Sequence, residues 1–402
     1  MHFLKEADVI HCVGVGGIGM SGLARLLMAE GKKVSGSDST PSPLTQRLQD
    51  EGLLFTRDIP EAVEVLVYSE AVPFEDAERA EGRKRGLPEL NYFQALGAWA
   101  EDKRVIALAG THGKTTTTAM LGEILIAANL DPTVLVGSTV ADFGGSNVRF
   151  GKSDLFVVEA CEYRRNFLSL KPSFLGILNV EWDHPDFFPD FESYKQAFAD
   201  LAAQSEHVFG PDYAEYTGPL GVFGAHNRKN AGLAMTIALA LGVSMEVIEK
   251  ALSTFRGTWR RMEYKGEWQG AKMYDDYAHH PTEIRASLAA LHAEYPGKRI
   301  VAVFEPHQYS RTRHLLADFG SAFAEADHVI IPGIYQVRDS QEDVAAVSGK
   351  SLADEIAKHH GAVEFCDGDG KVVERLGELL GPDSVLVVMG AGPIDRVFEV
   401  LV

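Results

Sequence analysis

Short apolar runs alternate with helix-like segments along the whole chain. Runs of this length, bounded by glycine and polar turns, are typical of buried strands. The alternation predicts an α/β protein with parallel sheets, because parallel neighbours need a crossover connection that is usually a helix. The predicted strands are 9–15, 32–38, 63–69, 104–110, 155–160, 174–180, 272–278, 299–305, 328–333 and 384–390.

Glycine-containing turns directly follow three of these runs. Their sequences are GVGGIG at 14–19, GTHGKT at 110–115 and GAGP at 390–393. Three such turns predict three α/β units, which suits a chain of 402 residues that is too long for one ordinary domain. The predicted domains are 1–98, 99–255 and 256–402.

Composition and charge narrow the class of protein. With 38 basic and 57 acidic side chains the formal charge is −19, which disfavours a nucleic-acid partner but still allows a small anionic ligand held by backbone N–H groups. The three cysteines form no CxxC pair, as is typical of buried thiols in a reducing compartment. No apolar run approaches the ~20 residues of a membrane span, and a predicted strand begins too early for a signal peptide. We therefore expect a cytoplasmic protein without a membrane partner.

The turn at 110–115 has the features of a phosphate-binding loop. It joins a predicted strand to a helix, so its backbone N–H groups and the helix N-terminus would face an anion. Lys114 would reach the β- and γ-phosphates of a nucleotide, and the Thr115 hydroxyl would suit a Mg²⁺ ligand position. The match to GxxxxGK[ST] is imperfect, because Leu108 stands where the first glycine belongs. The alternative is a turn whose glycine and threonine residues only cap the helix.

The turn at 14–19 fits GxGxxG through Gly14, Gly16 and Gly19, and Asp38 ends the next predicted strand about 20 residues later. Dinucleotide-binding folds have this arrangement, in which the turn holds a pyrophosphate. NAD, FAD and nucleotide sugars all suit such a turn. Glycines needed only for helix–strand packing are the alternative.

Acidic, amide and imidazole side chains follow two predicted strands of the second domain. Glu159 and Glu162 come at the end of the strand 155–160. The next strand is followed by Asn179, Glu181, Asp183 and His184. Because the ends of parallel strands gather at one edge of a sheet, these groups would lie near the loop 110–115 and could hold Mg²⁺ against nucleotide phosphates. Surface-loop acids and a capping histidine are the alternative.

Two later motifs carry side chains suited to a nucleotide. Asn227 and Asn230 lie near the start of an apolar helix, where they would either hydrogen-bond a base edge or only cap the helix. Arg260 and Arg261 would either bind phosphate or lie on a solvated surface.

The strand 272–278 ends with Asp275, Asp276, His279 and His280. Two histidines beside carboxylates suggest a transition-metal site, but no cysteine and no H-x₃-H spacing accompanies them, which argues against it.

Together these motifs resemble the Mur ligases of bacterial cell-wall synthesis. The stretches that carry the resemblance occur in family order from residue 11 to residue 395: HCVGVGGIGMSGLA, GTHGKTTT, VVEACEYRRNFL, NVEWDHPDFF, GAHNRKNA, RRME, DDYAHHPTEI, EPHQYSRTR and MGAGPID. Within the family, they are most similar to the enzymes that add the first amino acid, L-alanine, to UDP-N-acetylmuramate.

The resemblance implies three domains: a Rossmann-like UDP-sugar domain, a central ATP-binding domain with a parallel sheet of the P-loop ATPase type, and a C-terminal Rossmann-like domain closing on ATP and the amino acid. It implies ATP and Mg²⁺ as cofactors. The ATP-binding residues would be Gly110, Thr111, His112, Gly113, Lys114, Thr115, Thr116, Asn227, Asn230, Arg261 and Asp276. The UDP-sugar would contact Gly14, Gly16, Gly17, Ile18, Gly19, Met20, Asp38, Ser69 and His307. The metal ligands would be Thr115, Glu159 and His184, and the catalytic residues would be Lys114, Glu159, His184, His279 and Arg311.

The implied reaction is an ATP-dependent amide ligation in peptidoglycan synthesis. The muramoyl carboxylate attacks the γ-phosphate of ATP, and the amine of L-alanine then attacks the resulting acyl phosphate. The charge that builds up in the first step needs Lys114 and Mg²⁺ rather than a covalent nucleophile. The alternatives are a recycling ligase that joins an intact tripeptide to the same nucleotide sugar, an NAD-dependent oxidoreductase, and a non-catalytic relative that only binds the UDP-sugar. We expect a monomer or a homodimer.

The sequence departs from the family at three places. The stretch between residues 204 and 221 is shorter than usual, so we expect a reduced central domain that keeps its ATP edge. Phe198 stands where several sister ligases carry a carbamylated lysine, so we expect no carbamate. Gln308 stands where many relatives have a basic residue, which would weaken one substrate contact.

Overall fold

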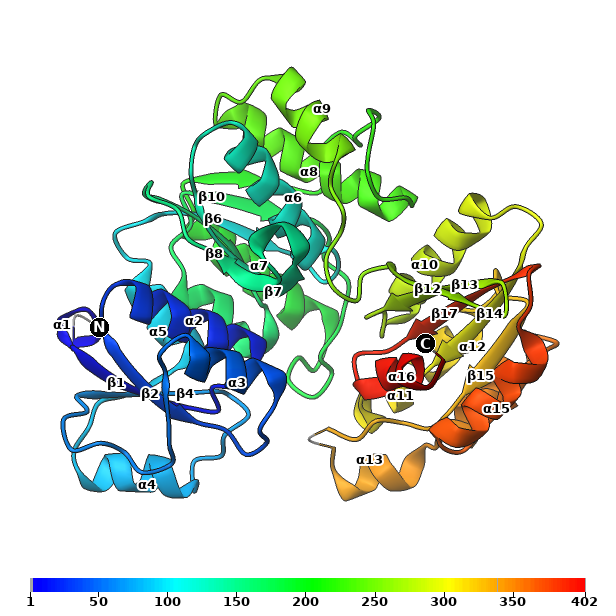
Figure 1. The fold of residues 1–402 in the computed structure, drawn as a ribbon, viewed down its shortest axis with the longest axis horizontal. Helices are drawn as coiled ribbons and strands as arrows, with labels where there is room; N and C mark the ends of the chain where they lie inside the picture. Colours follow the sequence, from blue (N-terminus) through cyan, green and yellow to red (C-terminus); the bar gives the residue numbers. More distant parts are fainter. Residues whose placement is uncertain (1–2, 338, 402) are drawn as a thin grey trace. The chain divides into compact units, whose positions relative to one another are not determined.

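The computed structural model describes residues 3–337 and 339–401. Contacts between residues divide the chain into two compact units, which we describe separately. The first unit extends to Val180 and adds Lys195–Ala214 and Ala231–Leu252. The second unit comprises Glu181–Tyr194, Glu215–Asn230 and the chain from Ser253 onward. The first contains two sheets and the second contains one (Figure 1).

The N-terminal sheet has five parallel strands in the order β3-β2-β1-β4-β5. The strand order reverses between β1 and β4, and such a switch point opens a crevice at the carboxyl ends of the strands. The elements are α1 (Phe3–Glu6), β1 (Val9–Val13), α2 (Ile18–Ala29), β2 (Lys33–Ser37), α3 (Pro43–Asp50), β3 (Leu54–Phe55), β4 (Val65–Tyr68), α4 (Ala77–Lys84), β5 (Glu89–Asn91) and α5 (Tyr92–Trp99).

The central sheet has six strands in the order β11-β10-β6-β9-β7-β8, and only β8 runs antiparallel to its neighbour. Residues 210–224 connect β11 to α8 without a helix or strand. The elements are β6 (Arg104–Ala109), α6 (Lys114–Ala127), β7 (Thr133–Val140), η1 (Ala141–Phe143), β8 (Ser146–Arg149), β9 (Leu155–Glu159), η2 (Tyr163–Ser169), β10 (Phe174–Ile177), α7 (Phe191–Ala203), β11 (His207–Phe209), α8 (Ala225–Ala240) and α9 (Met245–Ser253).

The C-terminal sheet also has six strands, in the order β12-β13-β17-β14-β15-β16, with β12 antiparallel at the edge. Its elements are β12 (Glu263–Trp268), β13 (Ala271–Asp276), α10 (Pro281–Glu294), β14 (Arg299–Phe304), α11 (Tyr309–His314), α12 (Leu316–Gly320), β15 (His328–Ile331), α13 (Gln341–Ala346), α14 (Gly349–Ile356), β16 (Val363–Phe365), α15 (Asp369–Leu379), β17 (Ser384–Met389), η3 (Pro393–Arg396) and α16 (Val397–Leu401).

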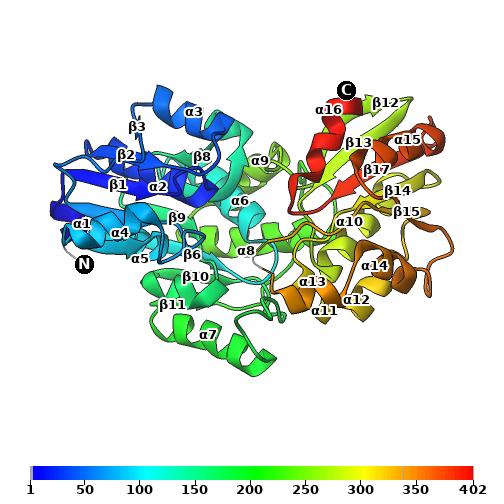
Figure 2. The ribbon, with the colours of Figure 1, turned by 90° about the horizontal axis from the view of Figure 1, so that it is seen from below.

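Both faces of the C-terminal sheet are covered, which explains why its parallel strands β14, β15 and β17 are almost continuously apolar. Helices α10, α12 and α14 lie on one face, and α15 and α16 lie on the other (Figure 2). Their apolar side chains belong to two separate buried clusters, one on each face. Within the described residues, no helix is both long and apolar enough to cross a membrane.

The predicted α/β class with mainly parallel sheets is confirmed, and all ten predicted strands are present. Each sheet lies within one predicted domain, although the exact domain boundaries stay a prediction. The missed strands are mostly short or peripheral: β3, β5, β7, β8, β11, β12 and β16. The effect of the short stretch after residue 204 on the central domain also stays a prediction.

Candidate active site

The predicted phosphate loop lies between β6 and α6 in the first unit. Gly110 and Gly113 have φ values of +140° and +86°, which favour glycine. A Cβ at position 110 would lie 2.9 Å from the Cβ of Leu178, so the turn also needs the missing side chain for space. Helix α6 begins at Lys114 without a side-chain cap, and such a helix N-terminus directs backbone N–H groups at an anion.

Asn179, which follows the neighbouring strand β10, holds this loop in place. Its side-chain oxygen accepts the backbone N–H of His112 at 2.9 Å, and its amide nitrogen donates to the His112 carbonyl at 3.0 Å. The backbone carbonyl of Asn179 accepts the N–H of Thr111 at 3.2 Å. The sequence placed Asn179 at this sheet edge but did not reveal that it clamps the loop.

The Lys114 side chain folds over the same turn. Its ammonium group donates to the carbonyls of Gly110 and Thr111 and to Glu162, at 2.9 Å from the carboxylate. Burial disfavours the charged amine, but the carboxylates of Glu162 and Glu159 outweigh this effect and raise the pKa of Lys114. Lys114 is therefore cationic and held over the turn, and its contact with a phosphate stays a prediction.

Two of the three predicted metal ligands meet beside the loop. The Thr115 hydroxyl donates to Glu159 at 3.1 Å, and the second Glu159 oxygen accepts the backbone N–H of Gly137. A hydroxyl and a carboxylate next to a phosphate loop are the hard oxygen ligands that Mg²⁺ prefers. The third predicted ligand, His184, belongs to the second unit.

The N-terminal glycine turn also has the predicted geometry. Gly14 has a φ of +79° and packs against Ser69, whose Cβ would lie 3.0 Å from a Cβ at position 14. Asp38 accepts the backbone N–H of Gly16 at 2.8 Å and that of Thr40 at 3.0 Å. In this structure Asp38 therefore closes the turn through backbone bonds, and its predicted contact with the UDP-sugar stays a prediction.

Helix α2 starts directly behind this turn, with Gly17 as an N-cap that offers no side-chain oxygen. A Cβ at Gly19 would lie 2.9 Å from the ring of Tyr92, so the third glycine of the motif is needed to admit this ring. Met20 is buried beneath the turn. No side chain caps the N-terminus of α2, and its contact with a ligand phosphate stays a prediction.

In the second unit, a buried ion pair joins the stretches NVEWDHPDFF and EPHQYSRTR. The guanidinium of Arg311 donates to Asp183 at 3.1 and 3.4 Å and to the carbonyl of His307 at 3.2 Å. Burial would raise the pKa of Asp183, but Arg311 outweighs it and holds that pKa well below its usual range. His184 adopts a φ of +57° and donates its N–H to the same carboxylate at 2.7 Å. Such a strained non-glycine residue is typical of functional sites.

His279 is held in a defined orientation at the end of β13. Its Nδ1 lies 3.0 Å from the carbonyl of Tyr277, and its backbone N–H donates to Glu283 at 2.9 Å. Because a carbonyl can only accept, Nδ1 carries the proton and Nε2 keeps its lone pair. Burial lowers the pKa of His279 to about 4, so the ring is neutral at pH 7.

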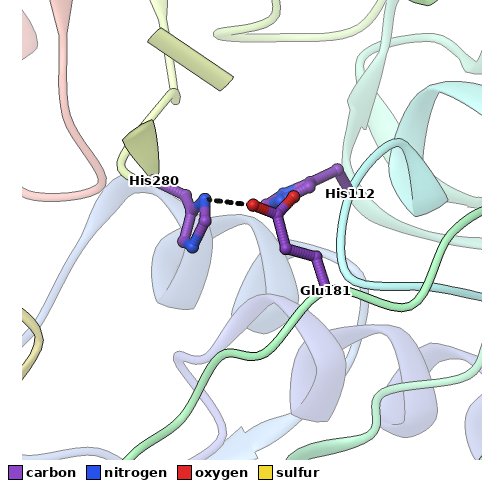
Figure 3. A group of neighbouring side chains, drawn as sticks. All are labelled: His112, Glu181 and His280. Carbon is purple, nitrogen blue, oxygen red and sulfur yellow. Dashed lines mark ion pairs between the residues drawn. The ribbon is translucent and has the colours of Figure 1, made fainter. Parts of the chain in front are cut away.

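His280 is the N-cap of α10, and its side chain accepts the backbone N–H of Thr282 at 3.3 Å. Glu181 lies 3.9 Å from Nδ1 of His280 and accepts the Thr282 hydroxyl at 2.6 Å. Figure 3 shows the Glu181 carboxylate directed at the His280 ring. The segment that carries Asp183 and His184 is therefore tied to α10 as well as to α11.

The residues predicted to meet the adenine and ribose also lie in this unit. Asn230 donates to the side chain of Asn227 at 3.3 Å, and Asn227 donates to the carbonyl of Phe223 at 2.8 Å. Asp276 accepts the Ser287 hydroxyl, and burial raises its pKa to about 6. These bonds orient the side chains, while their contacts with ATP stay predictions, as does that of Arg261.

The two adjacent arginines differ in a way that the sequence did not show. Arg260 is buried and donates to Asp275 at 3.1 Å and to the carbonyls of Gly390 and Gly392, both at 2.8 Å. It therefore holds the GAGP turn and is structural. Burial raises the pKa values of Asp275 and of nearby Glu305 to about 7. Glu305 begins the EPHQYSRTR stretch, but the sequence did not single it out as a buried acid.

Comparisons with known proteins agree with these observations. Three domains match in order: residues 9–104 match the Mur ligase family catalytic domain, residues 108–209 the Mur ligase middle domain, and residues 260–392 the Mur ligase glutamate ligase domain. The UDP-N-acetylmuramate–L-alanine ligase of Caldanaerobacter subterraneus is 37% identical, over 98% of this chain and 97% of its own length. That of Aquifex aeolicus is 36% identical, over 96% of this chain and 95% of its own.

Solved structures show the same fold. A UDP-N-acetylmuramate–alanine ligase from Thermotoga maritima superimposes with a TM-score of 0.80 at 24% identity, covering 98% of this chain and 97% of its own. A murein peptide ligase from Psychrobacter arcticus gives a TM-score of 0.69 at 22% identity, covering 98% of both chains. With whole-length relatives above 30% identity and three matching domains in order, the chain belongs to the Mur ligase family.

Proposed function

We propose that this protein joins L-alanine to the carboxylate of UDP-N-acetylmuramate in an ATP-dependent reaction of peptidoglycan synthesis. The whole-length relatives at 36–37% identity carry the name of this ligase, which supports the choice of substrates. The observation that carries the chemistry is the group formed by Lys114, Thr115 and Glu159 at the phosphate loop.

In the first step, the muramoyl carboxylate attacks the γ-phosphate of ATP, an acyl phosphate forms and ADP leaves. The backbone N–H groups at the start of α6 bind the phosphates, and the Lys114 ammonium exchanges its carbonyl contacts for phosphate oxygens. Asn179 keeps the loop rigid, so the donors need not reorganise as negative charge develops. Glu162 keeps Lys114 protonated.

Thr115 and Glu159 suit Mg²⁺, since both offer hard oxygen ligands beside the loop. When bound, the ion would neutralise charge on the phosphate oxygens. The role of His184 as a further ligand is part of this proposal.

In the second step, the amine of L-alanine attacks the acyl carbon and phosphate leaves. The neutral His279 offers Nε2 as a hydrogen-bond acceptor that would orient this amine and take up its proton. Arg311, held by Asp183, would face the negatively charged reacting groups.

The test is ADP release from the purified protein with ATP, Mg²⁺ and UDP-N-acetylmuramate, comparing L-alanine, the recycled tripeptide and no amine. We expect release that depends on L-alanine. Release only with the tripeptide would assign the protein to the recycling ligases. UDP-sugar binding without release in any arm would show a non-catalytic relative.

A further inference from the structure

Asn147 belongs to β8 of the central sheet, but its side chain bonds to helix α2 of the N-terminal domain, within the same unit. Asn147 is fully buried. Its Nδ2 donates to the carbonyl of Ile18 at 2.6 Å, and its Oδ1 accepts from Arg25 at 2.9 Å. Arg25 is fixed in turn by two bonds to Glu51, at 2.6 and 3.0 Å. Both halves of the amide are used, so its orientation is defined.

A glycine on α2 makes this contact possible. A Cβ at Gly22 would lie 2.4 Å from Leu135 on β7 and 2.8 Å from Nδ2 of Asn147. The φ of Gly22 is not positive, so the glycine is required by the close approach of the β7–β8 hairpin and not by the backbone conformation. The hairpin therefore packs directly on α2.

The bond to Ile18 acts on the phosphate-facing end of α2. The Ile18 carbonyl and the Gly19 N–H belong to one planar peptide group, so fixing the carbonyl also fixes the direction of that N–H. Gly19 lies in the first helical turn, where N–H groups have no partner within the helix and point toward a bound anion. Asn147 itself is too deeply buried to touch such a ligand.

We propose that Asn147 is a positioning residue that aligns the Gly19 N–H with the diphosphate of the UDP-sugar. This proposal rests on the proposed function. The same hairpin carries Gly137, whose N–H binds Glu159 beside the phosphate loop. One short hairpin thus supports both the UDP-sugar turn and the carboxylate of the ATP site.

The test compares Asn147→Ala and Asn147→Asp with the wild type, using UDP as the probe in calorimetric titration. Asp keeps an acceptor for Arg25 but places an oxygen instead of an N–H donor against the Ile18 carbonyl, so the bond to Ile18 is lost while the bond to Arg25 is kept. We expect UDP affinity to fall about tenfold in both variants. KM for UDP-N-acetylmuramate should rise by a similar factor, while kcat and KM for ATP change less than twofold.

Arg149→Ala is the matched control, because Arg149 lies on the same strand but bonds to Asp131 and Pro132 within the central domain. It should leave UDP affinity unchanged. Unchanged UDP affinity in a folded Asn147→Asp variant, or no UDP binding by the wild type, would overturn the proposal. The titration needs no turnover, so a wild type that binds UDP but releases no ADP with L-alanine would refute the proposed function and not this inference.

Discussion

At the scale of single residues, the decisive feature is how Lys114 is held. It lies between the loop carbonyls and a buried carboxylate, Glu162, whose charge keeps the amine protonated. The sequence identifies both residues as candidates but does not show that they pair, because Glu162 is far from Lys114 along the chain. The same applies to Asn179, which reaches the loop from a neighbouring strand.

Replacing Lys114 tests this arrangement. Lys114→Ala should lower ADP release about 10²–10³-fold, since a preorganised positive group at the transferred phosphate is lost. It should also destabilise the protein by about 1–3 kcal/mol, because Glu162 is left buried without its partner. Adding Glu162→Gln should restore stability, measured by urea unfolding, but not activity. Lys171→Ala, at an exposed lysine, is the control and should change neither property.

The lowered pKa of His279 leads to a prediction for how activity depends on pH. With a pKa of about 4, the ring is already neutral at pH 6, so kcat/KM for L-alanine should show no acidic limb from this group until the pH falls below about 5. His279→Gln should lower this kcat/KM at least about tenfold at pH 7.5. An acidic limb near pH 6.5 that disappears in the variant would contradict a neutral, buried imidazole.

At the scale of elements, the segment Glu181–Tyr194 stands out, because it follows a strand of the central sheet yet packs with the C-terminal unit. Asp183 ties it to α11, and Glu181 ties it to α10. Sequence order alone assigns this segment to the central domain. In the structure its side chains pair with residues of α10 and α11, while the domain boundaries stay a prediction.

The pair between Asp183 and Arg311 should therefore contribute strongly to stability. Asp183→Asn should lower the free energy of unfolding by about 3–5 kcal/mol, because a buried guanidinium loses its charged partner. The pKa of Asp183 is lowered, so this contribution is present above the unfolded pKa near 4 and is lost as the pH falls further. Arg313→Ala, which breaks an exposed pair, should lower the free energy of unfolding far less in the same denaturation experiment. Equal losses of unfolding free energy in the two variants would contradict a larger contribution from the buried pair.

At the scale of the whole molecule, the buried acids and the buried histidines of the second unit change the stability in opposite directions as the pH rises. Asp275, Asp276 and Glu305 have raised pKa values of about 6 to 7, so the stability linked to them is complete below the unfolded pKa near 4 and is lost as the pH rises toward 7. His226 and His279 have pKa values lowered to about 4, so stability linked to them is lost as the pH falls from 6.5 to 4.

Glu305→Gln separates the contribution of a buried acid to the pH dependence of stability from that of the buried histidines. The variant has no carboxyl to deprotonate, so it should be more stable than the wild type at pH 8, and the difference should shrink at pH 5. The measurement is the midpoint of thermal unfolding at both values. A difference that grows toward pH 5 would refute the raised pKa.

The sequence alone determined the α/β class, the ten central strands, the three glycine turns and the residue types of the phosphate loop. These features depend on local apolar patterning and on backbone requirements of single turns, which neighbouring residues encode. Only the tertiary structure decided which acid pairs with Lys114, which of two adjacent arginines is buried, and how Asn147 reaches α2. Such pairings join residues distant in sequence, and they depend on which strands become neighbours and which side chains packing excludes from water.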